Sequence, residues 1–298
     1  MIEIKNILDK IEYISFTGSN DIKIDKVKSL DQIEGVDNAI AWCNDQNLEK
    51  VKNINSSSII IVSETADKSI LESINCIVVL NPRRAFQTIL VNFFLETRIA
   101  QIHATAIIDG NAKIGNNVFI GHNVVIEKDC EIGNDVTILH NTVIFKGTKI
   151  GDQVNIGSNN TIGGTGFGYE KNVAGDFELI PHLGNVLIGN KVDIGNNTCI
   201  DRAVLGSTIL EENVKVDNLV HIAHGVIVRR NAVVIANAMI AGSVEIGENS
   251  WIAPSASILN KKNIGKNSLV GLGAVVLKAV EDNTIVAGNP AKFIKNLK

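Results

Sequence analysis

Histidine is scarce in this chain, with six copies among 298 residues, so each copy invites a chemical interpretation. His224 lies in the segment VDNLVHIAHG (216–225), with Asp217, Asn218 and His221 close by. An imidazole titrates near neutral pH, and a histidine held by rigid backbone is well suited to accept a proton. We therefore predict His224 as a general base, with its three polar neighbours as candidates for the same site.

Gly242 lies three hexapeptides after His224, in the segment AMIAGS (238–243), directly after Ala241. A backbone N–H with no side chain beside it is able to hold the oxyanion that forms when a thioester is attacked. The alternative is that Gly242 is only a corner glycine, and periodicity alone favours neither interpretation. The two residues meet only if three hexapeptides bring the chain back over itself.

His122 and His140 are separated by the same three hexapeptides, and each follows an isoleucine by two places. We expect these two side chains to stack on one edge of the fold. For this pair we favour the interpretation that the position simply tolerates histidine.

The glycine cluster GGTGFGY (163–169) resembles a phosphate-binding loop at first sight. It lacks the GK[ST] ending of such a loop and does not lead from a strand into a helix. We instead predict a flexible flap over a substrate cleft, with Gly166, Phe167 and Tyr169 as candidate substrate contacts.

The elements that must position these residues follow from a repeat of six. Eleven isoleucines recur at this spacing from Ile102 to Ile162, three more from Ile188 to Ile200, and twelve aliphatic residues from Leu210 to Val276. A period of six fits neither an α-helix nor a simple alternating strand, but it fits a short strand followed by a corner. Three such units predict one triangular coil, and the 26 repeats predict a parallel β-helix of eight to nine coils.

In this β-helix the aliphatic ladder should fill the prism with one residue per face. Coils then lie about 4.8 Å apart. Glycine follows many ladder residues, as in Ile114-Gly115 and Ile132-Gly133, and we expect these glycines to adopt corner backbone angles that other residues avoid. The two breaks in the ladder, 163–187 and the extra residues between Ile200 and Leu210, are the first places to look for a site.

Residues 1–98 lack the repeat and predict a small α/β domain. Segments 56–64 and 76–80 read as strands, and 82–96 reads as a helix with Pro82 in its first turn. We expect the β-helix to occupy 99–280 and a turn with a short basic tail to occupy 281–298.

Composition narrows the class of protein. A hydrophobic content of 45%, a charged content of 20% and a net charge of −4 indicate a soluble globular protein without an electrostatic footprint for nucleic acid. We see no run of about 18 apolar residues and no secretory signal, so we expect no transmembrane helix. The four cysteines are far apart, which argues against disulfides and structural zinc and favours the cytoplasm.

Five segments resemble the bacterial UDP-3-O-acylglucosamine N-acyltransferase family of lipid A biosynthesis. The resemblance is close from 102 to about 258 and loose before it. The segments are GGTGFGYEK (163–171), ELIPHLGNVLIG (178–189), NNTCIDRAVLGSTI (196–209), VKVDNLVHIAHGVIV (214–228) and NAMIAGS (237–243).

This resemblance implies a left-handed coil, a homotrimer with each active site in a groove between neighbouring prisms, and an N-terminal domain that holds the nucleotide base. It assigns the catalytic base to His224, the oxyanion glycine to Gly242 and a catalytic aspartate to Asp217. It makes His221 and His182 candidates for the substrate cleft.

Three departures from the family pattern bear on the substrates. Lys261 stands where the family has a second histidine. The uridine loop retains an aromatic residue, Trp42, but Leu48 stands where a tyrosine is expected. The family's C-terminal helical extension, which meets acyl carrier protein, is replaced by AGNPAK (287–292), which resembles the end of coenzyme A-dependent sugar acetyltransferases and makes Lys278, Lys292 and Ala241 candidate donor contacts.

The leading hypothesis is N-acylation of a nucleotide-linked amino sugar by a thioester, for lipid A or another surface glycan, with no tightly bound cofactor or metal. Acyl-coenzyme A is the favoured donor. The main alternative is the lipid A step itself, with acyl carrier protein and a hydroxyacyl chain. Two distant alternatives are a zinc-dependent β-helix carbonic anhydrase, using His221 and His224 with a neighbour's histidine, and a non-catalytic scaffold.

Overall fold

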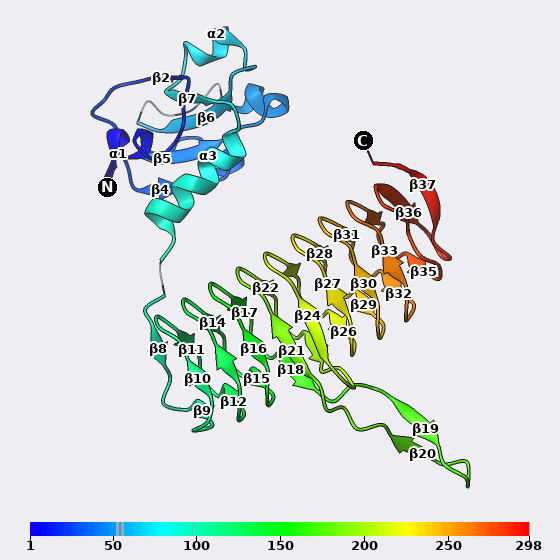
Figure 1. The fold of residues 1–298 in the computed structure, drawn as a ribbon. Helices are drawn as coiled ribbons and strands as arrows, with labels where there is room; N and C mark the ends of the chain where they lie inside the picture. Colours follow the sequence, from blue (N-terminus) through cyan, green and yellow to red (C-terminus); the bar gives the residue numbers. More distant parts are fainter. Residues whose placement is uncertain (52–53, 55–56, 97, 298) are drawn as a thin grey trace. The chain divides into compact units, whose positions relative to one another are not determined.

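The computed structural model describes residues 1–51, 54, 57–96 and 98–297. The chain forms two compact units, Met1–Thr97 and Arg98–Lys298. The second unit is a left-handed parallel β-helix, which confirms the predicted fold class (Figure 1).

The first unit is built on a five-stranded sheet in the order β2-β7-β6-β5-β4, parallel except for β2. The predicted strands are β6 and β7, and the predicted helix is α3 followed by a π-helical turn; residue 56 lies outside the described residues. Asn81 caps α3 by accepting a hydrogen bond from the Arg84 N–H. The elements in chain order are β1 (Ile2–Glu3), α1 (Ile4–Leu8), β2 (Ser15–Thr17), β3 (Lys23–Ile24), β4 (Lys26–Val27), η1 (Leu30–Gln32), β5 (Ala39–Trp42), η2 (Asp45–Val51), β6 (Ile59–Ser63), α2 (Lys68–Leu71), β7 (Cys76–Val79), α3 (Pro82–Ile89) and η3 (Leu90–Phe94).

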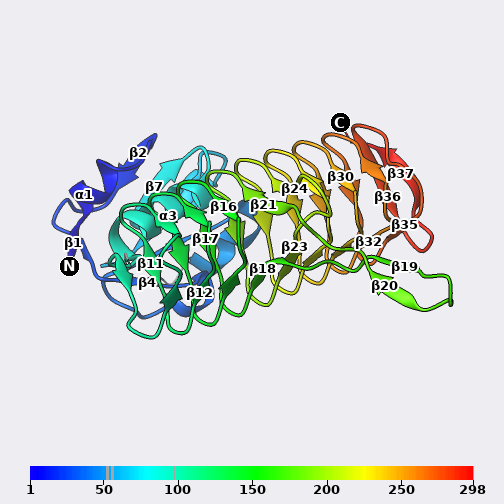
Figure 2. The same cartoon turned by 60° about the horizontal axis from the view of Figure 1, so that its bottom comes forward.

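Three parallel sheets form the faces of the prism (Figures 1 and 2). The first face contains β8 (Gln101–Ile102), β11 (Phe119–Ile120), β14 (Thr137–Ile138), β17 (Asn155–Ile156), β22 (Asp193–Ile194), β25 (Lys215–Val216), β28 (Val233–Val234), β31 (Trp251–Ile252), β34 (Leu269–Val270), β36 (Thr284–Ala287) and the antiparallel β37 (Lys292–Asn296). The second face contains β9 (Ile107–Ile108), β12 (Val125–Ile126), β15 (Val143–Ile144), β18 (Thr161–Gly164), β23 (Cys199–Asp201), β26 (His221–Ile222), β29 (Met239–Ile240), β32 (Ser257–Ile258) and β35 (Val275–Val276). The third face contains β10 (Lys113–Ile114), β13 (Glu131–Ile132), β16 (Lys149–Ile150), β21 (Asn185–Ile188), β24 (Ser207–Leu210), β27 (Ile227–Val228), β30 (Glu245–Ile246) and β33 (Asn263–Ile264). We call the corner after each face the first, second and third edge.

The aliphatic ladder is the core of this prism. Ladder residues pair with the residue three hexapeptides on wherever the chain is regular, as Ile120 pairs with Ile138. From Ile120 to Val276 every ladder side chain is at most 4% exposed. A second, smaller ring of buried residues such as Val136, Val214 and Ala238 lies two places before the ladder, so the prediction of one core residue per face was wrong.

The corner glycines have a different role from the one predicted. The positive φ angles belong to residues three places after the ladder, such as Asn231 at 59°, and not to Gly115 or Gly133. A Cβ on Gly133 would lie 2.6 Å from the Gly151 carbonyl carbon. These glycines are therefore required because adjacent coils leave no room for a side chain.

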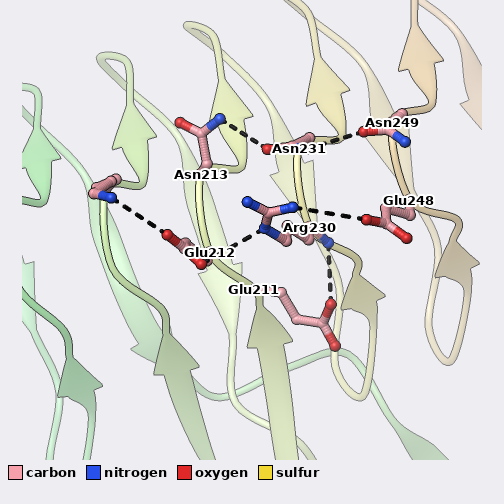
Figure 3. A network of polar contacts seen from close by, with 8 residues as sticks. Glu211, Glu212, Asn213, Arg230, Asn231, Glu248 and Asn249 are labelled. Carbon is pink, nitrogen blue, oxygen red and sulfur yellow. Dashed lines mark hydrogen bonds and ion pairs between the residues drawn. The ribbon is translucent and has the colours of Figure 1, made fainter.

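Polar ladders run along the edges outside the core. On the third edge the amide of Asn213 donates to Asn231, and that of Asn231 donates to Asn249, at 2.9 and 3.0 Å (Figure 3). Arg230 lies between Glu212 and Glu248 on the same edge. Residues at equivalent places in successive coils thus satisfy one another's hydrogen bonds, because the coil register stacks them.

The two breaks in the ladder lie next to each other on the prism. The first includes a hairpin of β19 (Tyr169–Lys171) and β20 (Phe177–Leu179), which projects away from the coils in both views (Figures 1 and 2). The second lies between β23 and β24, which pair with the strands flanking the first break, β18 and β21.

We predict that Ile240→Ala lowers the free energy of unfolding by about 2–5 kcal/mol, because the side chain is fully buried and its removal leaves a cavity. Ile102→Ala is the matched control, since Ile102 occupies the same ladder but is 51% exposed in the first coil. Urea unfolding followed by circular dichroism measures both. Equal losses for the two variants would contradict the ladder as the source of stability.

Candidate active site

His224 lies on the second edge of the prism, two residues after the ladder residue Ile222 of β26. Its side chain is partly exposed. The residue at the equivalent place in the next coil is Gly242, because β26 pairs in register with β29. The length of one coil therefore brings these two predicted residues together.

The imidazole of His224 rests directly against Gly242. A Cβ built on Gly242 would lie 2.7 Å from both Cε1 and Nε2 of His224, so only glycine leaves room for this ring. On the first edge, the N–H at the position equivalent to Gly242 is paired: the His122 N–H donates to the side chain of His140, which lies one coil further on. Among the described residues nothing accepts a hydrogen bond from the Gly242 N–H, which leaves this donor unpaired beside the imidazole.

The first ladder break folds back over the same edge. Gly166 lies between two histidines, since a Cβ there would be 3.0 Å from His182 Nε2 and 3.1 Å from His224 Cβ. The His182 and His224 rings are 5.3 Å apart and nearly perpendicular. The buried Arg202 anchors the start of this segment by donating from Nε to the Gly163 carbonyl at 2.6 Å.

His182 is held in one tautomer with an unused acceptor. It is only 7% exposed, and its Nδ1 lies 2.7 Å from the Ile180 carbonyl, so Nδ1 carries the proton. Its Nε2 is buried and has no hydrogen-bond partner among the described residues. Buried polar atoms are normally paired, so an unpaired one indicates strain or a functional contact.

Burial lowers the pKa of His224, and the neighbouring His182 and His221 lower it further. A lowered pKa keeps the imidazole neutral near pH 7 with its lone pair available. This is the protonation state that a general base requires.

Asp201 is the carboxylate beside these histidines, and we did not predict it from the sequence. It directly follows Ile200, which pairs with Ile222 one coil on. Its side chain is 14% exposed, and Oδ2 lies 3.7 Å from His221 Nε2. Burial raises the pKa of Asp201, while His221 and His182 act in the opposite direction. The only sequence signal was its position at the second ladder break.

Asp217 and Asn218 lie on the first edge, one face away from His224. Asp217 accepts hydrogen bonds from the N–H groups of Asn218 and Ala236 at 2.7 and 3.2 Å. The Asn218 side-chain oxygen accepts from the Asn196 N–H at 2.7 Å. No contact joins these two residues to His224 among the described residues of one chain, so their predicted place in the site depends on the predicted neighbouring prism.

The predicted stack of His122 and His140 is present on the first edge, with ring centroids 5.0 Å apart. His103 extends the stack, 3.3 Å from His122. These histidines therefore lie away from His224. No three His, Cys, Asp or Glu side chains among the described residues are arranged to hold a metal ion.

The remaining candidates lie at different distances from this corner. Ala241 adjoins Gly242, and the Lys261 N–H donates to the Gly242 carbonyl at 3.0 Å from the next coil. Phe167 and Tyr169 are exposed and contact each other, with rings 4.9 Å apart. Lys278 and Lys292 are exposed in the last part of the prism, while Trp42 packs against the core of the first unit.

Comparisons with known proteins agree with the β-helix fold. A family model described as the GMPPB C-terminal domain matches residues 99–176. The chain is 42% identical over 213 residues to UDP-3-O-acylglucosamine N-acyltransferase 1 of Legionella pneumophila, covering 64% of this chain and 59% of that protein. It is 41% identical over 160 residues to the enzyme of the same name from Francisella tularensis, covering 47% of this chain and 46% of that protein.

Among solved structures, the Moraxella catarrhalis UDP-N-acetylglucosamine O-acyltransferase matches with a TM-score of 0.59 and 27% identity, over 66% of this chain and 75% of that chain. The Campylobacter jejuni UDP-N-acetylglucosamine acyltransferase matches with a TM-score of 0.60 and 24% identity, over the same shares of both chains, which supports the fold alone. The chain spans about half the length of several curated relatives. The resemblance noted from the sequence is confirmed over the prism. Within the described residues, every helix is too short or too polar to span a bilayer.

We predict that His224 titrates below the ordinary histidine pKa of about 6.5, because burial and two neighbouring imidazoles disfavour its charged form. The measurement is an NMR titration of the imidazole signals. His182→Gln should raise the midpoint of His224, since a glutamine cannot take up a proton and repel the charged form of His224. A wild-type midpoint at or above the ordinary value would contradict the packing described for this ring.

Gly242→Ala should displace the His224 ring, because the new Cβ would lie 2.7 Å from two ring atoms. We expect changed imidazole chemical shifts for His224 with the fold retained. Gly110→Ala is the matched control, since a Cβ at Gly110 meets nothing within 4 Å. Unchanged His224 signals in the Gly242 variant would argue against the close contact.

Proposed function

Because this chain belongs with the hexapeptide-repeat acyltransferases in its fold and in the sequence of its prism, we propose that it transfers an acyl group from a thioester to the amine of a nucleotide-linked amino sugar. The observation that carries this proposal is the close contact between the His224 imidazole, whose lowered pKa keeps it neutral, and Gly242, whose N–H has no acceptor among the described residues. A base next to an oxyanion donor is what aminolysis of a thioester requires.

The reaction proceeds by direct attack. The amine nitrogen bonds to the thioester carbonyl carbon while His224 takes the proton that the nitrogen loses. The carbonyl electrons move to oxygen, and the Gly242 N–H donates a hydrogen bond to that oxyanion. The C–S bond then breaks as the oxyanion collapses, and the leaving sulfur receives the proton from His224, which returns the protein to its starting state.

The acceptor is an amino sugar on a nucleoside diphosphate, which the activity named for the related UDP-3-O-acylglucosamine N-acyltransferases supports. The buried Nε2 of His182 is an acceptor for a sugar hydroxyl or amine in this corner, provided that the residues around Gly166 move aside. Trp42 is the aromatic residue that we propose for the base. This part of the proposal rests on the family resemblance.

For the donor we propose acyl-coenzyme A. The supporting observation is the chain's C-terminal end, where AGNPAK joins β36 to β37 and the exposed Lys278 and Lys292 are available for phosphates. Acyl carrier protein is the second candidate donor, because the curated relatives are N-acyltransferases of 3-O-acylated glucosamine. We also propose a homotrimer, in which Asp217 of one prism approaches His224 of the next.

The test is an assay of free thiol release with acyl-coenzyme A and acyl carrier protein as donors and UDP- and dTDP-linked amino sugars as acceptors. His224→Ala should lower turnover by roughly 10²–10⁴-fold with the fold and oligomeric state retained. His122→Ala is the matched control, because His122 follows β11, four coils before the coil that holds His224. Near-normal turnover in the His224 variant, or no turnover of any donor by the wild type, would overturn the proposal.

A further inference from the structure

Three histidines and Asp201 lie close together at the second edge of the prism. His182, His221 and His224 come from the first ladder break and from β26 with the corner that follows it, and Asp201 comes from the coil before. His221 is 3.7 Å from the Asp201 carboxylate, and the His182 and His224 rings are 5.3 Å apart. The corner is therefore rich in groups that take up protons and has one group that offsets their charge.

The Asp201 carboxylate is poorly satisfied by its own chain. It lies largely buried, and no hydrogen-bond donor contacts it among the described residues; His221 is its ion-pair partner. The adjacent Arg202 does not neutralise it, because the Arg202 guanidinium is turned to the Gly163 carbonyl and the Phe145 ring. On the same strand, burial raises the pKa of the Cys199 thiol, and the nearby Asp201 carboxylate raises it further.

The balance of charges in this corner suggests a role for the Asp201 carboxylate. When His224 accepts a proton, the corner gains a positive charge next to two other imidazoles, which is unfavourable where water is partly excluded. A buried carboxylate in the same corner offsets that charge. Asp217 cannot act in this way within one chain, because it lies on the first edge and is bonded to backbone N–H groups there.

We propose that Asp201 is a positioning residue of the acyl transfer, whose carboxylate holds His221 and balances the positive charge that the histidine corner gains when His224 takes the proton from the attacking amine. The catalytic part of this inference rests on the proposed function. The electrostatic coupling between Asp201 and the histidines is independent of it.

The proton balance is closed within the reaction. The amine nitrogen gives up one proton to His224 as the C–N bond forms, and His224 returns it to the sulfur as the C–S bond breaks. Asp201 neither gains nor loses a proton overall. Its negative charge offsets the positive charge of His224 only while that imidazole is protonated. The other titratable groups that face Asp201 are His182, His221 and Cys199.

The experiment compares Asp201→Asn, Asp201→Glu and a control, Asp193→Asn, by NMR titration of the histidines. Asp193 is a carboxylate of the same coil that pairs with Lys215. We expect Asp201→Asn to lower the midpoint of His224, because an opposite charge in the same corner is lost. Asp201→Glu should largely restore it, and Asp193→Asn should leave it unchanged.

The same variants are then assayed for thiol release across pH. Asp201→Asn should lower kcat by about tenfold and move the acidic limb of the kcat/KM profile to lower pH, with KM changing less than kcat. Histidine midpoints that are the same in Asp201→Asn and Asp193→Asn would overturn the inference. If the wild type turns over no thioester, the proposed function fails, while the titrations still decide whether Asp201 controls the histidine charges.

Discussion

The constraint on which this molecule depends is the register of its coils. From Ile120 onward each ladder residue is buried, and the parallel strands pair each one in register with its equivalent in the next coil wherever the chain is regular. A slip of one residue would turn every aliphatic side chain of a face out of the core. The register therefore also fixes the positions of the corner residues, including those of the site.

Close stacking is also what makes the glycines informative. Gly133 and its equivalents follow the ladder because the next coil's backbone leaves no space for a Cβ. Gly242 has a different neighbour, since it is the imidazole of His224 that fills the space above it. The same lack of space therefore produces a packing position in one coil and places a histidine against a glycine in another.

Two of the titratable groups around His224 come from the segments that interrupt the repeat. His182 is brought in by the first ladder break, and Asp201 stands where the second break begins. These interruptions add Asp201 and the buried His182 Nε2, which has no hydrogen-bond partner among the described residues, to the corner that holds His224. The regular coils thus place His224 against Gly242, and the irregular segments supply the groups around them.

By itself the sequence determined the prism, its three faces and the stacking of Gly242 on His224, because a strict period converts directly into position along a solenoid. It misjudged the corner glycines, overlooked the second core ring and could not reveal Asp201. Nor could it show that within one chain Asp217 and His224 lie on different edges, since the chain between them crosses a face. Only the tertiary structure decided these points, because the contacts of Asp201 and His182 depend on how the inserted segments fold back, and no period governs those segments.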